Sequence, residues 1–303
     1  MNNYIVVNKT FVRSKNKSSL IINRYFYSLL VFILFTILLY LVFNKTNLIL
    51  PLVKSLILSL IIAIFIQYII NLISKNNKFV DIFRKDYIHI IALIIGLFGV
   101  NINILVLFMA IFISLIVKKI INNINLSVSL YGILIILLYK YFTSDINYSL
   151  GIINDIELTK DIVIDYLIGT EYLSPVLSLF IFIYLFNKKS IKYNIFISYI
   201  CTIFIVMLLY GIFNGMNLIF PFIYLSINSI IFLSVYTLTD YIATPTINET
   251  QRIYGVILGF TTSILSFIVP VFAVVIPHIV GPIILTKYLD NMSYKIKYRK
   301  KEL

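Results

Sequence analysis

Residues 234–255 read SVYTLTDYIATPTINETQRIYG and place a short polar loop between two apolar segments. Asp240 ends the first segment, and Arg252 lies just before the second. Further breaks follow at Val269–Pro270 and at Gly281–Pro282. In a bilayer, such breaks are tolerated only where protein or a water-filled cavity satisfies the freed backbone groups. The stretch is therefore either an ordinary loop, with Asp240 and Arg252 solvated at the membrane edge, or part of a functional site.

The composition of the chain indicates that a bilayer surrounds it. Of its 303 residues, 61% are hydrophobic and 12% are charged. Soluble domains carry roughly 25% charged residues, so this chain cannot cover a normal globular surface. Several apolar runs reach the ~20 residues that a helix needs to cross a bilayer. We predict an all-α fold, that of a polytopic helical membrane protein.

The apolar runs predict about ten transmembrane helices. The runs at 87–99 and 175–187 are short for a full crossing, which is typical of broken helices around a central site, although misplaced ends would look the same. Five runs precede the polar residues 143–174 and five follow them, so we expect two inverted five-helix halves. The ten runs are 27–43, 48–74, 87–99, 101–117, 126–142, 175–187, 194–212, 215–237, 253–268 and 270–287.

Positive charge predicts the orientation of the chain in the membrane. With the N-terminus in the cytoplasm, the cytoplasmic loops carry most of the basic residues, whereas the outer loops carry Lys45 and Lys160. The net charge of +13 is then an orientation signal and not a nucleic-acid footprint. We expect a multi-pass plasma-membrane protein with both termini cytoplasmic. Its predicted parts are a basic N-terminus (1–26), a first transmembrane half (27–142), an acidic extracytoplasmic loop (143–174), a second transmembrane half (175–288) and a basic tail (289–303).

Residue counts argue against several kinds of site. Cys201 is the only cysteine, so the chain cannot by itself hold an iron–sulfur cluster. The two histidines, His89 and His278, are far apart, and no spacing suggests a metal site. Neither a glycine-rich phosphate loop nor a nucleophile–base pair is apparent, which argues against a nucleotide-binding site or a hydrolase.

The stretch from Thr239 to Gly255 resembles a family signature. Residues 239–245 (TDYIATP) and 252–255 (RIYG) are similar, without a gap, to the A-T-D-P-x-T-S-P…R-x-x-Y/F-G segment of the RnfD/NqrB family. Members of that family are the flavin-carrying membrane subunits of the Rnf complex and of the sodium-translocating NADH:quinone reductase. The resemblance extends less closely to 13–30, 165–193 and 282–290, and His278 stands where the family usually has Asn.

The resemblance implies FMN, and a second flavin, as cofactors. The family's outer loop carries D-x-x-S-G-A-T, in which the threonine takes FMN as a phosphoester from a separate flavin transferase. Residues 145–151 (DINYSLG) are the counterpart, with Asp145 retained and Gly151 at the acceptor position. Glycine has no hydroxyl to form the phosphoester, and Ser149 is a nearby alternative. The implied flavin-binding residues are Asp145, Ser149, Glu171, Thr239, Asp240, Pro245, Tyr254 and Gly255.

Three functions remain open. The resemblance implies a subunit that passes electrons through flavin and couples this to Na⁺ or H⁺ movement, together with other membrane and flavoprotein subunits; it would not be catalytic alone. Gly151 favours a second hypothesis, a transporter of flavin or another small molecule, or a non-redox scaffold, on the same ten-helix fold. A third, a polysaccharide polymerase or flippase, would usually need Arg or His in the outer loop, and residues 143–174 contain neither.

Overall fold

The computed structural model describes residues 15–73, 87–121, 126–143, 173–227, 229–240 and 243–299. Within these ranges every regular element is a helix and no strand occurs, which confirms the predicted all-α class. Helices are expected here, because a chain in lipid must satisfy its backbone N–H and C=O groups within each segment. The predicted extracytoplasmic loop lies outside the described residues except at its two ends.

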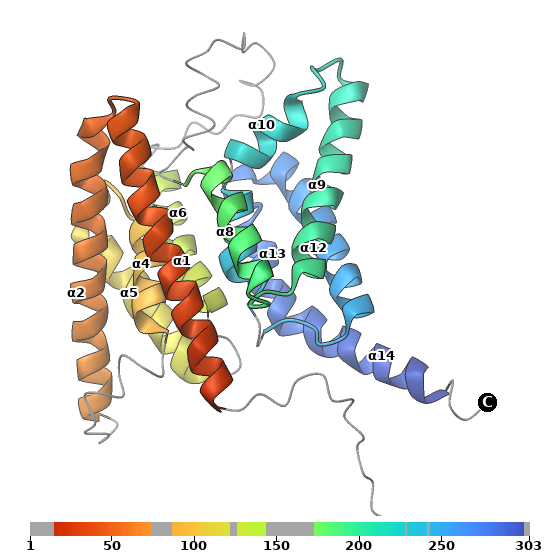
Figure 1. Cartoon of the computed structure of the whole chain (residues 1–303), viewed down its shortest axis with the longest axis horizontal. Helices are drawn as coiled ribbons and strands as arrows, with labels where there is room; N and C mark the ends of the chain where they lie inside the picture. Colours follow the sequence, from red (N-terminus) through yellow and green to blue (C-terminus); the bar gives the residue numbers. More distant parts are fainter. Residues whose placement is uncertain are drawn as a thin grey trace, which may run out of the picture.

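The first half of the chain forms a group of helices drawn in red to yellow in Figure 1. Asn101 and Asn103 separate the helices of the predicted runs 87–99 and 101–117: Asn101 takes a φ of 61°, and the Asn103 side chain accepts a hydrogen bond from the N–H of Leu105 at 3.1 Å. An Asn that accepts from the first turn in this way begins a new helix. The described elements are α1 (Lys15–Val42), η1 (Thr46–Leu48), α2 (Ile49–Ile73), α4 (Ile88–Phe98), α5 (Ile104–Ile120), η2 (Leu126–Val128) and α6 (Ser129–Phe142).

The second half, green to blue in Figure 1, is more broken. One predicted break occurs, since α12 ends just before Val269–Pro270. At Gly281–Pro282 the predicted break is wrong, because the helix continues there through a π-helical segment into α14. Single π-helical turns of this kind are frequent at functional sites. The described elements are α8 (Pro175–Asn187), α9 (Tyr193–Phe213), α10 (Phe220–Ile227), α11 (Ile230–Leu233), η5 (Ser234–Leu238), α12 (Asn248–Ile268), η6 (Pro270–Phe272), α13 (Val275–Val280), η7 (Gly281–Leu285) and α14 (Thr286–Arg299).

Helix length separates full spans from shorter segments. Five described stretches are long and apolar enough to cross a membrane, namely Leu20–Val42, Thr46–Leu72, Tyr193–Phe213, Asn248–Ile268 and Pro270–Met292. A sixth is formed if α10, α11 and η5, bent by 60°, count as one span. In contrast, α4 has 11 residues. At ~1.5 Å per residue it is roughly half as long as the hydrocarbon core is thick. Each of the ten predicted runs thus contains helix among its described residues, and ten complete crossings remain a prediction.

The short helix α4 lies in the interior of the first half. All of its residues except His89 are buried, and it packs against α1, α2, α5 and α6. On the outside, α1 and α2 expose apolar side chains such as Leu34 (60%) and Ile61 (58%). In a membrane protein such a surface faces lipid. The outer helices therefore separate α4 from the bilayer.

The two halves share one hydrophobic core. They meet where α1 packs on α8 and where α6 packs on α13. Between them, the rings of Phe32 and Phe232 lie 5.0 Å apart, centroid to centroid. At the end where α1 begins, the Arg24 guanidinium donates a hydrogen bond to the carbonyl of Lys188 at 2.6 Å. The inverted relation between the halves remains a prediction.

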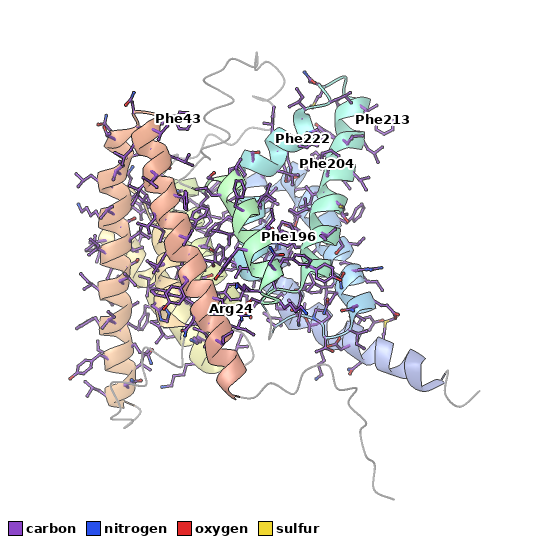
Figure 2. The ribbon with its side chains drawn as sticks, viewed as in Figure 1. Arg24, Phe43, Phe196, Phe204, Phe213 and Phe222 are labelled. Carbon is purple, nitrogen blue, oxygen red and sulfur yellow. The ribbon has the colours of Figure 1, made fainter. Side chains whose placement is uncertain are left out.

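Basic side chains gather at one end of the bundle. We call the end where α1 begins the basic end; Figure 2 labels Arg24 near it and Phe43 and Phe213 at the opposite end. The opposite end carries Lys45, Lys54 and Lys140. This asymmetry agrees with the charge pattern from which the orientation is predicted. The described basic residues at the basic end are Lys15, Lys17, Arg24, Lys118, Lys119, Lys188, Lys189, Lys192, Arg252 and Lys287, with Lys295, Lys297 and Arg299 further along α14.

Candidate functional site

Asp240 joins the two halves at the basic end. It follows η5 and is buried, with 3% of its surface exposed. Its Oδ2 accepts hydrogen bonds from the N–H of Leu126 at 2.8 Å and from the N–H and the hydroxyl of Ser127, both at 3.2 Å. The start of a helix leaves N–H groups unpaired and carries partial positive charge. Asp240 therefore caps, from the other half of the chain, the helical turn that leads into α6.

The contacts of Asp240 test the interpretation that it lies in an ordinary loop, solvated at the membrane edge. The interpretation of Asp240 as a solvated residue in an ordinary loop is wrong, because helix N–H groups and a hydroxyl surround its carboxylate. Arg252 is exposed, as that interpretation expects. The charge at position 240 thus stays in the protein interior by pairing with a helix N-terminus, which reduces the cost of removing it from water.

Residues 243–247 form a non-helical segment whose carbonyls are bound by side chains from the helices around it. The Lys192 ammonium, at the start of α9, donates to the carbonyl of Thr244 at 2.7 Å. The Thr286 hydroxyl, on α14, donates to the carbonyl of Ala243 at 2.9 Å. These bonds supply the backbone partners that a break at membrane depth requires.

A second set of bonds comes from α12 and α14. The Gln251 amide donates to the carbonyls of Pro245 and Thr246, at 3.1 Å and 3.3 Å. The Asp290 carboxylate accepts the N–H of Thr246 at 3.2 Å. Residues 239–240 and 243–247, with these partners, constitute what we call the junction. The junction connects α6, α9, α12 and α14 at the basic end.

Gly255 lies where α12 packs closely on α9. A Cβ at Gly255 would overlap the Ser198 hydroxyl and lie 2.6 Å from the carbonyl oxygen of Ile195. One turn later, a Cβ at Gly259 would lie 2.8 Å from the carbonyl oxygen of Tyr199. Two glycines four residues apart allow helix backbones to approach in this way. Packing therefore accounts for glycine at position 255, and its predicted role in flavin binding remains untested.

Thr239 and Tyr254 are fully buried beside the junction. The Thr239 hydroxyl donates to the carbonyl of Val235 at 2.6 Å. A Cβ at Gly281, in the π-helical η7, would lie 2.9 Å from the Tyr254 hydroxyl. Pro245 is buried as well. The structure thus brings Thr239, Asp240, Pro245 and Tyr254 to one region, as expected for residues of one site.

His278 is buried in α13, between the break at Val269–Pro270 and the π-helical segment η7. Its Nδ1 lies 3.3 Å from the Thr237 hydroxyl, which donates its own proton to the carbonyl of Leu233 at 2.7 Å. The hydroxyl must then accept, so Nδ1 of His278 is the donor. In the neutral ring, Nε2 is consequently an acceptor, and it is buried without a hydrogen-bond partner among the described residues.

Three predicted flavin-binding residues, Asp145, Ser149 and Glu171, lie outside the described residues, as does Gly151 at the family's acceptor position. The part of the chain that the structure describes contains no group of three or more His, Cys, Asp or Glu side chains that could hold a metal ion. The structure therefore leaves the predicted covalent flavin site untested.

Sequence reasoning missed the residues that hold the junction together. Lys192, Gln251 and Asp290 are polar residues at the edges of apolar helices, and this signal could have identified them. Nothing in the sequence around Ser127 indicated a contact with Asp240, which lies 113 residues away in the chain.

A comparison with protein-family models covers both halves. The model described as the NQR2, RnfD, RnfE family matches residues 5–288. The chain belongs to this family. The resemblance expected from residues 239–255 is thereby confirmed at the level of the family, and the match includes the junction except for Asp290. A comparison with curated proteins finds no match.

Proposed function

We propose that this chain is an RnfD-like membrane subunit of an ion-translocating electron transport complex, which passes electrons through flavin and couples this to movement of Na⁺ or H⁺. The observation that supports the proposal is the family match over residues 5–288. Its partners would be the other membrane and flavoprotein subunits of an Rnf-type complex. It would lie in the plasma membrane with both termini in the cytoplasm.

The residues present do not fit a phosphoester at the family's usual position, because Gly151 has no hydroxyl. Among the described residues nearby, the Thr143 hydroxyl already donates to the carbonyls of Tyr139 and Lys140 at the end of α6. Flavin would therefore be held without a covalent bond or on another hydroxyl. The proposed electron transfer therefore does not use a flavin attached at position 151.

The chain's own residues would serve this function by holding the second half on the first. The Asp240 carboxylate binds the start of η2, and Lys192 and Asp290 bind the backbone on either side of Pro245. A redox subunit needs rigid spacing between electron donor and acceptor, since the protein's part is to position the cofactor and set its electronics.

A second candidate function is supported by Gly151. A small-molecule transporter, with flavin as one possible solute, or a non-redox scaffold on the same fold would not need the acceptor hydroxyl. A bound redox cofactor is expected for the proposed subunit and is not expected for the transporter or the scaffold.

The test is the flavin content of the full chain purified after co-expression with a flavin transferase. The matched control combines Tyr148→Ser, Ser149→Gly, Leu150→Ala and Gly151→Thr, which rebuilds the family's acceptor motif. In-gel fluorescence and an FMN mass adduct are expected for this control, and flavin released only on denaturation is expected for the natural chain. An adduct on a hydroxyl of residues 143–174 would also support the redox function. Natural chain that is folded and free of flavin, beside a labelled control, would favour the transporter or scaffold.

A further inference from the structure

The last helix, α14, extends beyond the helix bundle. Its first turns are anchored: Leu289 is buried, the Thr286 hydroxyl binds the carbonyl of Ala243, and Asp290 accepts the N–H of Thr246. From there α14 continues to Arg299, and Figure 1 shows it leaving the other helices at the basic end. The candidate span that contains its start ends at Met292. By length and composition, the rest of α14 therefore follows the end of the candidate span.

The sequence of this extension is basic and carries an apolar stripe, with Lys295 and Arg299 on or beside it. Residues 291–299 (NMSYKIKYR) contain three basic residues and no acidic one. At 3.6 residues per turn, positions 288, 292 and 296 follow one side of the helix, and all three are apolar or aromatic. Tyr288 and Met292 are 63% and 43% exposed. A helix with an apolar stripe and basic residues is typical of segments that lie in the membrane interface.

We propose that residues 291–299 lie on the membrane surface and bind the headgroups of anionic lipids. Two features favour lipid over another protein as the partner. The exposed side of η7 and α14 continues the lipid-facing surface of the last span, through Ile284 (60%) and Tyr288. The positive charge follows the end of the span, at the depth of the phosphate groups, where each basic residue gains interaction with anionic lipid.

The surrounding surface has the same sign of charge. Lys287 is exposed on the first turn of α14, and Arg252 is exposed on α12, which packs against α14. The nearest acidic side chain on α14, Asp290, is half-buried and bound to the backbone of Thr246. Charge complementarity therefore favours an anionic surface.

The chain contains no tryptophan, so one introduced tryptophan gives an unambiguous fluorescence signal. We would make Ile296→Trp and its matched control Tyr294→Trp in the full chain. These positions differ by two residues, or about 200° around the helix. Each variant would be placed in nanodiscs of neutral lipid alone or with anionic phosphatidylglycerol, using lipids brominated on their acyl chains as quenchers.

In anionic discs we expect the tryptophan at position 296 to be quenched severalfold more strongly than the tryptophan at position 294. The difference should shrink in neutral discs and in high salt. Adding Lys295→Gln, Lys297→Gln and Arg299→Gln to Ile296→Trp should also reduce the quenching, because each charge changes surface binding by about fivefold. Far-UV circular dichroism and a monodisperse elution profile would establish that each variant is folded.

Three results would overturn the proposal. Equal quenching at both positions would mean that α14 does not lie flat with one side in the membrane. Water-exposed emission at both positions would mean that the extension projects into solution, where a protein partner could bind it. Quenching that is independent of lipid charge and of salt would exclude recognition of anionic headgroups. None of these results depends on whether the chain carries flavin.

Discussion

A carboxylate at the edge of an apolar segment is usually explained by access to water, and Asp240 is a counterexample. Its Oδ2 replaces water with two backbone N–H groups and one hydroxyl, all from residues 126–127. Hydrogen bonds to an ionised group are stronger than those between neutral groups. At this position the charge therefore contributes to tertiary structure.

Replacing Asp240 with Ala should destabilise the chain. The N–H groups of Leu126 and Ser127 would lose their acceptor, and each unsatisfied buried donor costs about 1–3 kcal/mol. We expect a clear decrease in the thermal midpoint of the detergent-solubilised chain, followed by circular dichroism. Asp240→Asn keeps an acceptor oxygen and should have a smaller effect. Glu249→Ala, which changes an exposed acid in the first turn of α12, is the control. An equal decrease in this control would contradict the capping role.

The tautomer of His278 can be measured directly, because the chain has only two histidines. With His89→Gln, ¹⁵N-histidine labelling leaves a single imidazole for NMR. We expect protonated Nδ1 and unprotonated Nε2, since the Thr237 hydroxyl can only accept from this ring. Adding Thr237→Val should remove the preference. A proton on Nε2 in the parent protein would show that Nδ1 does not donate to the Thr237 hydroxyl.

Sequence alone could place the residues of the junction but not their partners. The motif from Thr239 to Gly255 indicated where the site lies, and its charged residue is indeed buried there. The partner residues 126–127 carry no matching pattern, because a backbone N–H is the same in every residue except proline. Only the tertiary fold brings these groups together.

At the level of elements, hydrophobicity predicted helices and polar residues predicted breaks. The boundary between the runs 87–99 and 101–117 and the break at Val269–Pro270 both occur close to where they were expected. The central position of α4 could not be predicted in the same way. Lipid and protein interior are both apolar, so a buried helix and a lipid-facing helix have similar sequences.

The contact between α9 and α12 should be sensitive to a single methyl group. Gly255→Ala places a Cβ against the Ser198 hydroxyl and the carbonyl of Ile195, which a backbone cannot easily avoid. Overpacking of this kind costs about 1–3 kcal/mol. Val256→Ala is the matched control, since Val256 is the next residue and is 46% exposed. Thermal midpoints should fall in the first variant and change little in the second; a tolerated Gly255→Ala would show that the helices can separate at low cost.

At the level of the whole molecule, the uneven distribution of basic residues predicts orientation. Cys201, the only cysteine, is exposed on α9 and would first be replaced by Ala. Asn47→Cys then reports on the α1–α2 turn, and Asn187→Cys reports on the turn after α8; both positions are exposed. A membrane-impermeant maleimide added to intact cells should label the first and spare the second. The reverse pattern would place the basic end outside the cell.

The sequence could not predict which helices pack against each other in the whole molecule. The charge pattern supplied the side of the membrane, and the apolar runs supplied the segments. The pairing of α1 with α8 and of α6 with α13 depends on the fit of side chains from distant parts of the chain, and no residue-level repeat reveals it.

The bond from Asp240 to residues 126–127 also has a consequence for biosynthesis. A ribosome synthesises residues 126–127 more than a hundred residues before Asp240 emerges. During that interval the turn before α6 lacks its acceptor, so the first half enters the bilayer as an unfinished unit. Final docking of α6 must then wait for the second half. A nascent chain stopped before residue 240 should consequently be a preferred substrate for membrane quality-control proteases.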